Sequence, residues 1–189
     1  MSTSSSSIVR WSALAAMLGG LLWVVKGGVI MLGGSDPDLF IPAQFFFGVA
    51  LIGLHTCLAG RGGLLGRVGG FLAYIAVLLS FVNALYSVFF AEDGPQTPFP
   101  FNATYAIAGL AIFVGLVLLG LATLRVDILP RRWRVLPLAI GLLALLPVWV
   151  LAFIHLELPV VVLGFAWVLL GYVLWSSMGE TVGETSRVR

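Results

Sequence analysis

Charged side chains are scarce in this sequence: only 10% of its 189 residues are Asp, Glu, Lys or Arg, whereas 60% are hydrophobic. A soluble domain usually has about 25% charged residues, so a chain this poor in charge could not cover its own surface in water. The composition therefore argues against an ordinary water-soluble domain and predicts that lipid surrounds most of the chain. We expect the lipid bilayer as its main partner and no nucleic acid.

Residues that bind metals or act as nucleophiles are scarce as well. The single cysteine, Cys57, excludes an internal disulfide and any cysteine-based metal site. The two histidines, His55 and His155, fall near opposite faces of the membrane in the arrangement predicted below, so they cannot form a cluster or a Ser-His-Asp triad. We expect no catalytic residue, no metal site and no cofactor.

What the chain does contain is long apolar runs. A helix needs roughly 20 apolar residues to cross a bilayer, and helices satisfy their own backbone groups in hydrocarbon. The predicted fold is all-α, a polytopic bundle of six transmembrane helices, with Pro147 kinking the fifth. The predicted spans are about 12–33, 39–59, 68–90, 101–124, 135–153 and 160–175. Residues 1–11 and 176–189 flank this transmembrane domain (12–175) as flexible polar ends.

Loop charges give the orientation, because the loops fall on alternating sides of the membrane. One side receives every arginine of the chain: Arg10, Arg61, Arg67, Arg125, Arg131, Arg132, Arg134, Arg187 and Arg189. The other side has no arginine or lysine in its loops and receives Asp36, Asp38, Glu92, Asp93 and Glu157. Cytoplasmic loops collect Lys and Arg, so both termini should be cytoplasmic. We expect a multi-pass protein of the plasma (inner) membrane, and the excess of arginine over lysine is typical of a GC-rich bacterium.

A weak internal repeat appears when the chain is shifted by 67 residues, the difference between Gly48 and Gly115. The other matches include Gly53, Arg67 and Val68 with Gly120, Arg134 and Val135. These matches predict a parallel repeat of helices 2–3 and 4–5, as in some transporters. Chance matching between apolar segments is the alternative.

Lys26 is the only charge that falls deep inside a predicted span. It should lie roughly 10 Å below the outer surface at 1.5 Å per residue, and a lysine at that depth usually faces the bundle interior or water. The same depth count places Gln44, Asn83, Tyr86 and Tyr105 in this layer. One hypothesis is an outward-open polar pocket formed by these five residues, with the acids of the outer loops at its rim. The alternative is a structural lysine satisfied by amide, hydroxyl and carbonyl groups.

Two further groups could bind lipids or other hydrophobic molecules. The arginines Arg131, Arg132 and Arg134 could bind anionic lipid head groups, or they could simply set the topology. Aromatic rings crowd the outer half and could form a groove for a quinone, a carotenoid or a lipid tail, although ordinary packing explains them equally well. These aromatic residues are Phe45, Phe46, Phe47, Phe89, Phe90, Phe99 and Phe101.

Three functions from different classes follow from these features. The first is a non-enzymatic membrane subunit or scaffold, assembled with other proteins or with copies of itself and binding a hydrophobic ligand or lipid. The second is a small transporter or channel with its outward-facing pocket at Lys26. The third is a membrane enzyme that modifies a lipid with Lys26 or with His155 and Glu157.

Overall fold

The computed structural model describes residues 3–58, 60–90, 100–126, 128–145 and 147–187, and within these ranges it contains helices and no strand. The all-α fold class predicted from the sequence is confirmed. The six α-helices and one 3-10 helix (η1) are α1 (Thr3–Met31), α2 (Phe40–Leu58), α3 (Gly63–Phe90), α4 (Phe101–Arg125), α5 (Leu136–Leu145), η1 (Pro147–Phe153) and α6 (Leu158–Arg187).

Five of these helices are long and apolar enough to cross a membrane. The qualifying segments are Ser7–Met31, Phe40–Leu58, Gly63–Phe89, Ala103–Arg125 and Leu158–Ser177. Each has at least the 18 residues that a bilayer requires, because an α-helix rises 1.5 Å per residue. These helices could be predicted because their apolar runs are continuous and lack the alternation of apolar and polar residues that is typical of a strand.

The fifth predicted span is not one continuous helix. The α-helical part α5 has 10 residues, and the 3-10 helix η1 follows it from Pro147. A proline has no amide hydrogen, so it cannot make the backbone hydrogen bond that would continue an α-helix. The sequence predicts a kink at Pro147, whereas the structure ends the α-helix at Leu145. With 10 residues, α5 alone is shorter than the roughly 20 residues that a membrane-spanning helix needs.

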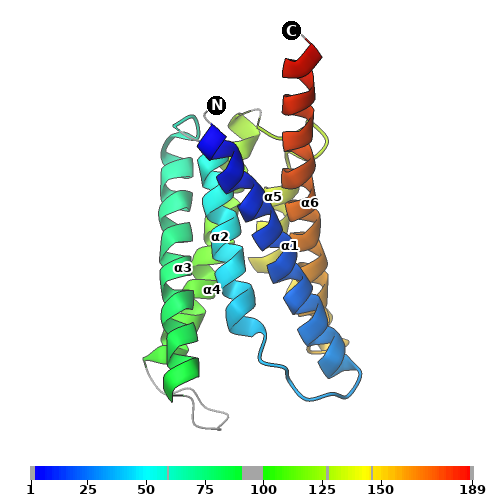
Figure 1. Ribbon diagram of the computed structural model, residues 1–189. Coiled ribbons are helices and arrows are strands. Elements are labelled where there is room, and N and C mark those ends of the chain that lie inside the picture. The colour runs from blue at the N-terminus through cyan, green and yellow to red at the C-terminus, as the bar shows by residue number, and fades with distance from the viewer. Residues whose placement is uncertain (1–2, 59, 91–99, 127, 146, 188–189) are drawn as a thin grey trace.

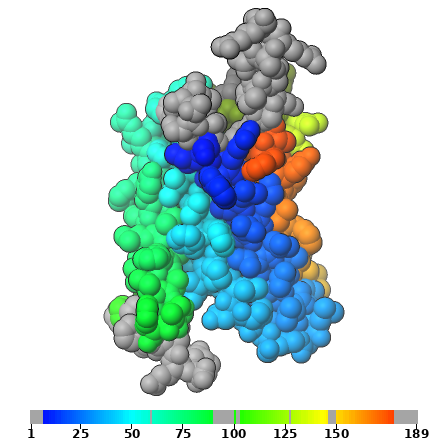
Figure 2. Space-filling model, viewed as in Figure 1, coloured from blue at the N-terminus to red at the C-terminus, as the bar shows by residue number. Residues whose placement is uncertain are grey.

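The helices pack as a bundle in which α2 contacts α1, α3 and α4. Helix α1 lies between α2 and α6, and α4 lies between α3 and α5, so the first and last helices of the chain are neighbours (Figure 1). The core is formed by fully buried side chains of α2, α4 and α6, including Phe47, Leu51, Leu116 and Trp167. Figure 2 shows α1, α2 and α3 side by side on one face of the bundle.

The outward face of α3 is apolar and exposed. Its exposed large side chains are three or four residues apart, so they form one stripe along the helix. They are Phe71, Tyr74, Leu78, Phe81 and Leu85. Such a stripe would be costly in water and is the expected surface of a helix that faces lipid.

Both chain ends lie at the same end of the bundle (Figure 1). The α2–α3 and α4–α5 connections, which contain Arg61, Arg131, Arg132 and Arg134, lie at this end, and the α1–α2 connection with Asp36 and Asp38 lies at the other. Glu92 and Asp93 lie outside the described residues. Residues 91–99 of the α3–α4 connection lie outside them too, and the orientation stays a prediction.

The helix ends differ from the predicted spans where polar residues or glycines occur. Helix α1 begins at Thr3 and α6 continues to Arg187, within segments that the sequence predicts to be flexible. Helix α3 begins at Gly63, inside a predicted loop. Gly60 and Gly63 have φ angles of +75° and +59°, a backbone conformation that favours glycine, and they allow the tight connection between α2 and α3.

The residues matched by the weak repeat do not share equivalent neighbours. A side chain at Gly53 would meet Ser12 of α1, whereas one at the matching Gly120 would meet Leu138 of α5. Helix α3 has 28 residues and its counterpart α5 has 10. The internal duplication stays a prediction.

Candidate functional site

Lys26 is paired with a carboxylate from the loop that follows its own helix. Its Nζ atom donates to both carboxylate oxygens of Asp36, and the Asp38 backbone N–H donates to Asp36 Oδ1 over 3.0 Å. The lysine side chain is 10% exposed and the carboxylate 56%. The hydrogen bond from Lys26 holds the pKa of Asp36 below its usual value. The loop therefore folds back onto α1, and one of the acids predicted at the rim reaches the lysine below it.

Gln44 joins α2 to α4 through its side-chain amide. Its Nε2 atom donates to the backbone carbonyl of Tyr105 over 3.3 Å, and the residue is 2% exposed. Gly109 lies one helical turn beyond Tyr105, and a Cβ atom there would lie 3.2 Å from Gln44 Nε2. The absence of a side chain at Gly109 therefore leaves room for the amide.

Asn83 makes a comparable polar contact between α3 and α4. The Thr104 hydroxyl donates to Asn83 Oδ1, and Asn83 is fully buried. Within the described part of the chain, Asn83 Nδ2 and the hydroxyl of Ser80, one turn away, have no hydrogen-bond partner. The polar groups at this depth are thus joined in pairs, one between α2 and α4 and one between α3 and α4.

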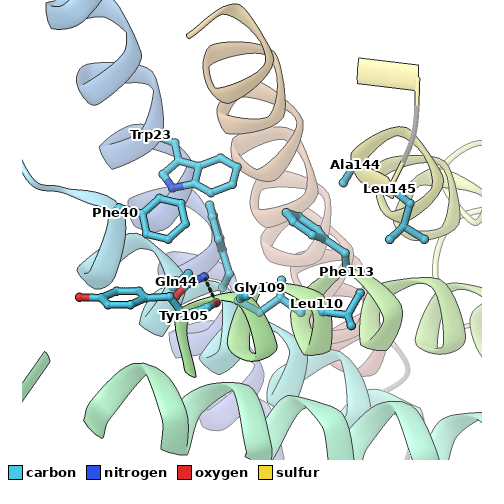
Figure 3. Close-up of a pocket in the computed structure, with 12 residues that line it drawn as sticks. Trp23, Phe40, Gln44, Tyr105, Gly109, Leu110, Phe113, Ala144 and Leu145 are labelled. Carbon is cyan, nitrogen blue, oxygen red and sulfur yellow. Dashed lines mark hydrogen bonds between the residues drawn. The ribbon is translucent and has the colours of Figure 1, made fainter. Parts of the chain in front are cut away.

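A cavity of about 510 Å³ opens beside the Gln44 contact, between α1, α2, α4 and α5. This volume is in the range of small-molecule sites, which are mostly apolar with a few placed polar groups. Figure 3 shows Trp23, Phe40, Gln44 and Tyr105 at one side of the cavity and Phe113, Ala144 and Leu145 at the other. The full lining consists of Trp23, Phe40, Gln44, Phe47, Tyr105, Ala106, Gly109, Leu110, Ile112, Phe113, Ala144 and Leu145.

Stacked aromatic rings fix the wall of this cavity on the α1–α2 side. The Trp23 indole stacks on Phe40, with ring centroids 5.9 Å apart, and meets Phe47 edge-on at 5.0 Å. Phe47 stacks in turn on Trp167 of α6 at 4.3 Å. Such pairs restrain the rings beyond what simple burial would do, so this wall is preformed.

Two buried polar atoms of the cavity lining lack a partner among the described residues: the acceptor Oε1 of Gln44 and the donor Nε1 of Trp23. Both residues are at least 97% buried. An unsatisfied buried polar group costs about 1–3 kcal/mol, and native proteins keep few of them. Because each of the two atoms has less than 1 Å² of accessible surface, neither is open to the cavity, and the two residues line it with their other atoms.

The structure divides the five residues of the predicted polar pocket. Gln44 and Tyr105 line the cavity, whereas Lys26, Asn83 and Tyr86 are not part of its lining. A cavity therefore lies at the depth predicted for these residues, but the charged Lys26 does not line it.

Trp23, Phe113 and Gly109 are lining residues that the sequence reasoning missed. The available signal was the position of Trp23, whose N–H group lies inside a span instead of at an interface, where tryptophan is enriched.

The predicted aromatic groove contributes one residue to this cavity. Phe47 lines it, whereas Phe45 and Phe46 pack edge-on against each other at 6.0 Å and Phe89 is exposed. Phe99 and the side chains of Phe90 and Phe101 lie outside the described residues. The other aromatic residues of the cavity wall are Trp23 of α1, Phe40 of α2, and Tyr105 and Phe113 of α4, none of which belongs to the predicted groove.

The arginines proposed to bind anionic lipid lie in the connection between α4 and α5. Arg131 and Arg132 are exposed, and the Arg132 guanidinium lies 5.7 Å from the centre of the Trp133 ring. The Thr123 hydroxyl of α4 contacts the carbonyl of Arg134 over 3.3 Å, which holds this connection against the bundle. The charges are accessible at the arginine-rich end of the molecule.

No protein-family model, curated protein or solved structure matches this chain. The site is therefore interpreted from its own chemistry. An apolar cavity of this volume with an aromatic wall can bind a mostly hydrophobic molecule.

Proposed function

We propose that this chain is a non-enzymatic integral membrane protein that binds a hydrophobic ligand in the cavity between α1, α2, α4 and α5. The observation that carries the proposal is an apolar cavity of about 510 Å³ whose wall on the α1–α2 side is fixed by the rings of Trp23, Phe40 and Phe47. A hydrophobic ligand would bury its apolar surface against these rings, which is the main favourable contribution to such binding.

The proposed orientation places the arginine-rich end of the bundle, with both termini, in the cytoplasm of a bacterial cell. The distribution of arginines supports it, because cytoplasmic loops collect positive charge. Gln44 and Tyr105 each lie one turn from the other end of their helices. The cavity would then open at the level of the outer leaflet.

Lipid and protein contacts form a second part of the proposal. The exposed guanidinium groups of Arg131 and Arg132, together with Arg134, would bind anionic lipid head groups at the inner interface. The exposed apolar stripe of α3 would face lipid tails, another subunit of a membrane complex or a second copy of the chain.

Transport is the weaker alternative for this geometry. The ammonium group of Lys26 is bound by Asp36, and Lys26 is outside the cavity lining. Ion pathways through membranes usually place ionisable groups on a water-filled cavity. The apolar walls favour retention of a hydrophobic ligand over passage of an ion. A lipid-modifying enzyme would need a reactive group in the cavity wall, and no described lining residue supplies a nucleophile in an activating environment.

Photolabelling in liposomes tests the proposed binding. An alkane that carries a diazirine should label the α4 segment 105–113 more strongly than the lipid-facing stripe of α3, because the cavity retains it. Ala106→Phe should abolish the excess labelling, since Ala106 lines the cavity with an exposed side chain and can take a ring without disturbing the core.

The matched control is Ala139→Phe on α5, an exposed alanine outside the lining, which should leave the labelling unchanged. Equal labelling of α3 and α4, or no effect of Ala106→Phe, would refute the proposed function.

A further inference from the structure

We infer that the ligand of this cavity is the hydrocarbon chain of an intact zwitterionic membrane lipid, which enters sideways along the face of α4 that α5 leaves uncovered. This inference rests on the proposed function and names the ligand class and its route. The lipid head group would stay outside the cavity, at the acidic end of the bundle.

Helices α4 and α5 pack closely toward the arginine-rich end of the bundle. A Cβ atom on Gly120 of α4 would lie 2.5 Å from the backbone nitrogen of Leu138, and one on Gly141 of α5 would lie 2.9 Å from the backbone nitrogen of Val117. The two contacts are three residues apart on each helix and run in opposite directions, so they define one antiparallel register between α4 and α5.

This close contact stops where the α-helix of α5 ends. Four residues further in the same register, Leu145, the last residue of α5, comes level with Phe113 of α4. From Pro147 the chain continues as η1, whose main neighbours among the described helices are α6 and α5. Because proline cannot make the next α-helical hydrogen bond, no continuation of α5 covers α4 from Leu110 back to Tyr105.

The open part of the cavity lining lies on this stretch of α4. Ala106 and Leu110 are exposed, and the other lining residues that share their face of the helix are partly exposed. By contrast, the lining residues of α1 and of the interior of α2 are at most 3% exposed. The cavity therefore opens to the side of the bundle along α4, where lipid tails would surround a transmembrane helix.

The lining suits a hydrocarbon chain better than a head group. The described lining residues include none with a charged side chain, and burying a phosphate without a counter-charge is far more costly than burying methylene groups. From Tyr105 to Phe113 the lining rises about 12 Å along α4, at 1.5 Å per residue. It thus follows a membrane-spanning helix, which is also the direction of lipid chains in a bilayer.

Charges near the mouth of the cavity disfavour an anionic head group. Phe40, which lines the cavity, follows Asp38 by two residues, and a Cβ atom on Gly27 would lie 3.3 Å from the Glu157 carbonyl oxygen, so the loop before α6 is at the same end. The described loops at this end, 32–39 and 154–157, contain three acids and no arginine or lysine. The ammonium group of Lys26 is already bound to Asp36. Like charges repel, so a zwitterionic lipid fits this end better than an anionic one.

Photolabelling with a lipid tests the inference. The probe is a phosphatidylcholine with a diazirine in the middle of one acyl chain, added at low fraction to phosphatidylcholine liposomes that contain the full chain. We expect the α4 segment 105–113 to be labelled at least about fourfold more than the exposed stripe of α3, the effect of burying one additional methylene group. A phosphatidylglycerol with the same labelled chain should give a smaller excess.

A variant at the opening tests the route. Leu110→Trp should remove the excess labelling, because Leu110 both lines the cavity and is exposed, so a larger side chain there fills the opening. The matched control is Leu78→Trp on α3, where the leucine is also exposed. This change should leave the labelling of α4 unchanged.

Each outcome decides the question. If the diazirine alkane labels segment 105–113 in excess and the phosphatidylcholine probe does not, the ligand is a free hydrophobic molecule, and the inference fails while the proposed function stands. Stronger labelling by phosphatidylglycerol would overturn it as well, and labelling of α4 below that of α3 would mean that protein covers this face. These comparisons need no variant. An excess that survives in a folded Leu110→Trp protein would rule out the sideways route, whereas failure of the alkane itself to label α4 in excess would refute the proposed function.

Discussion

Gly20 of α1 and Gly164 of α6 face each other so closely that neither position can hold a side chain. A Cβ atom on Gly20 would lie 2.4 Å from the Gly164 carbonyl oxygen, and one on Gly164 would lie 2.7 Å from the Gly20 carbonyl oxygen. The contact recurs seven residues away in both directions. A Cβ on Gly171 would lie 2.6 Å from the Ala13 oxygen, and one on Gly27 would lie 2.5 Å from Val161.

This series joins the first helix of the chain to the last one. Residues seven apart lie on nearly the same face of a helix, and small residues allow close approach in lipid, where packing drives helix association. The antiparallel register places Gly27 near the loop before α6 and Ala13 near the arginine-rich end. Trp23 and Lys26 belong to the same helix, so the contact also fixes the α1 wall of the cavity.

We expect Gly20→Ala to destabilise the bundle. The added methyl group would meet the Gly164 carbonyl and the backbone nitrogen of Val168 at 2.8 Å, and overpacking against backbone costs about 1–3 kcal/mol. The measurement is thermal unfolding in detergent. Gly28→Ala on the same helix is the matched control, because nothing lies within 4 Å of its Cβ position. Equal midpoints for the two variants would mean that α1 and α6 are not closely packed.

A second prediction concerns acid. Because Lys26 lowers the pKa of Asp36 below its ordinary value of 3.8, the folded state binds a proton there less readily than the unfolded state. The ion pair therefore stabilises the protein fully above pH 3.8, and this contribution is lost as the pH falls through the lower pKa of the folded state. We expect a loss of about 1 kcal/mol or less, since the carboxylate is more than half exposed.

Asp36→Asn should remove this part of the acid sensitivity in unfolding midpoints measured from neutral pH to pH 2. Asp38→Asn provides the control: Asp38 has a φ of +50°, a conformation that asparagine also adopts, and among the described residues the ion pair of the Lys26 ammonium group is with Asp36. If Asp36→Asn and the wild type lose the same stability in acid, the ion pair contributes nothing.

How much of this fold could be predicted depends on how far apart in the sequence the interacting residues lie. The hydrogen bonds of a helix join residues that are close in sequence, so each long apolar run could be predicted as a helix by itself. The missing amide hydrogen of Pro147 predicted a disturbance in the fifth span. The change to a 3-10 helix could not be predicted, because it depends on packing. The depth count placed Gln44 and Tyr105 in one layer, because 1.5 Å per residue fixes depth wherever a helix is tilted little, and a hydrogen bond joins these two residues in the structure.

Pairwise contacts within that layer could not be predicted, because depth says nothing about rotation around the helix axis. The pairing of Lys26 with Asp36 needs a loop that folds back across ten residues. Trp23 lies in an apolar run where an indole resembles any packing residue, and its place in the cavity wall depends on its contacts with Phe40 and Phe47 of α2. Hydrophobic pattern thus determines the spans, whereas the site depends on tertiary contacts.

A third prediction tests the polar contact between α3 and α4. Thr104→Val keeps the shape of the side chain and removes the hydroxyl that donates to Asn83 Oδ1, which leaves a fully buried acceptor with one partner fewer. We expect a loss of about 0.5–1.5 kcal/mol in unfolding free energy, the usual size for polar contacts between membrane helices.

Thr56→Val is the control for this variant, because the Thr56 hydroxyl donates only to the Ile52 carbonyl of its own helix, over 2.8 Å. Its loss should change stability little. A double-mutant cycle of Thr104→Val with Asn83→Leu should show coupling, and additive effects would contradict a direct contact.

The last prediction tests the orientation on which the lipid-binding proposal depends. Cysteines are placed in a Cys57→Ala background at Leu32, which is 91% exposed in the loop between α1 and α2, and at Arg61, exposed between α2 and α3. A membrane-impermeant maleimide added to whole bacterial spheroplasts should label Leu32→Cys, because its loop has no positive charge, and should reach Arg61→Cys only after the membrane is opened. The reverse pattern would place the cavity at the inner leaflet. Labelling of both from one side would mean that α2 does not cross the bilayer, which would remove the basis for a lateral ligand site.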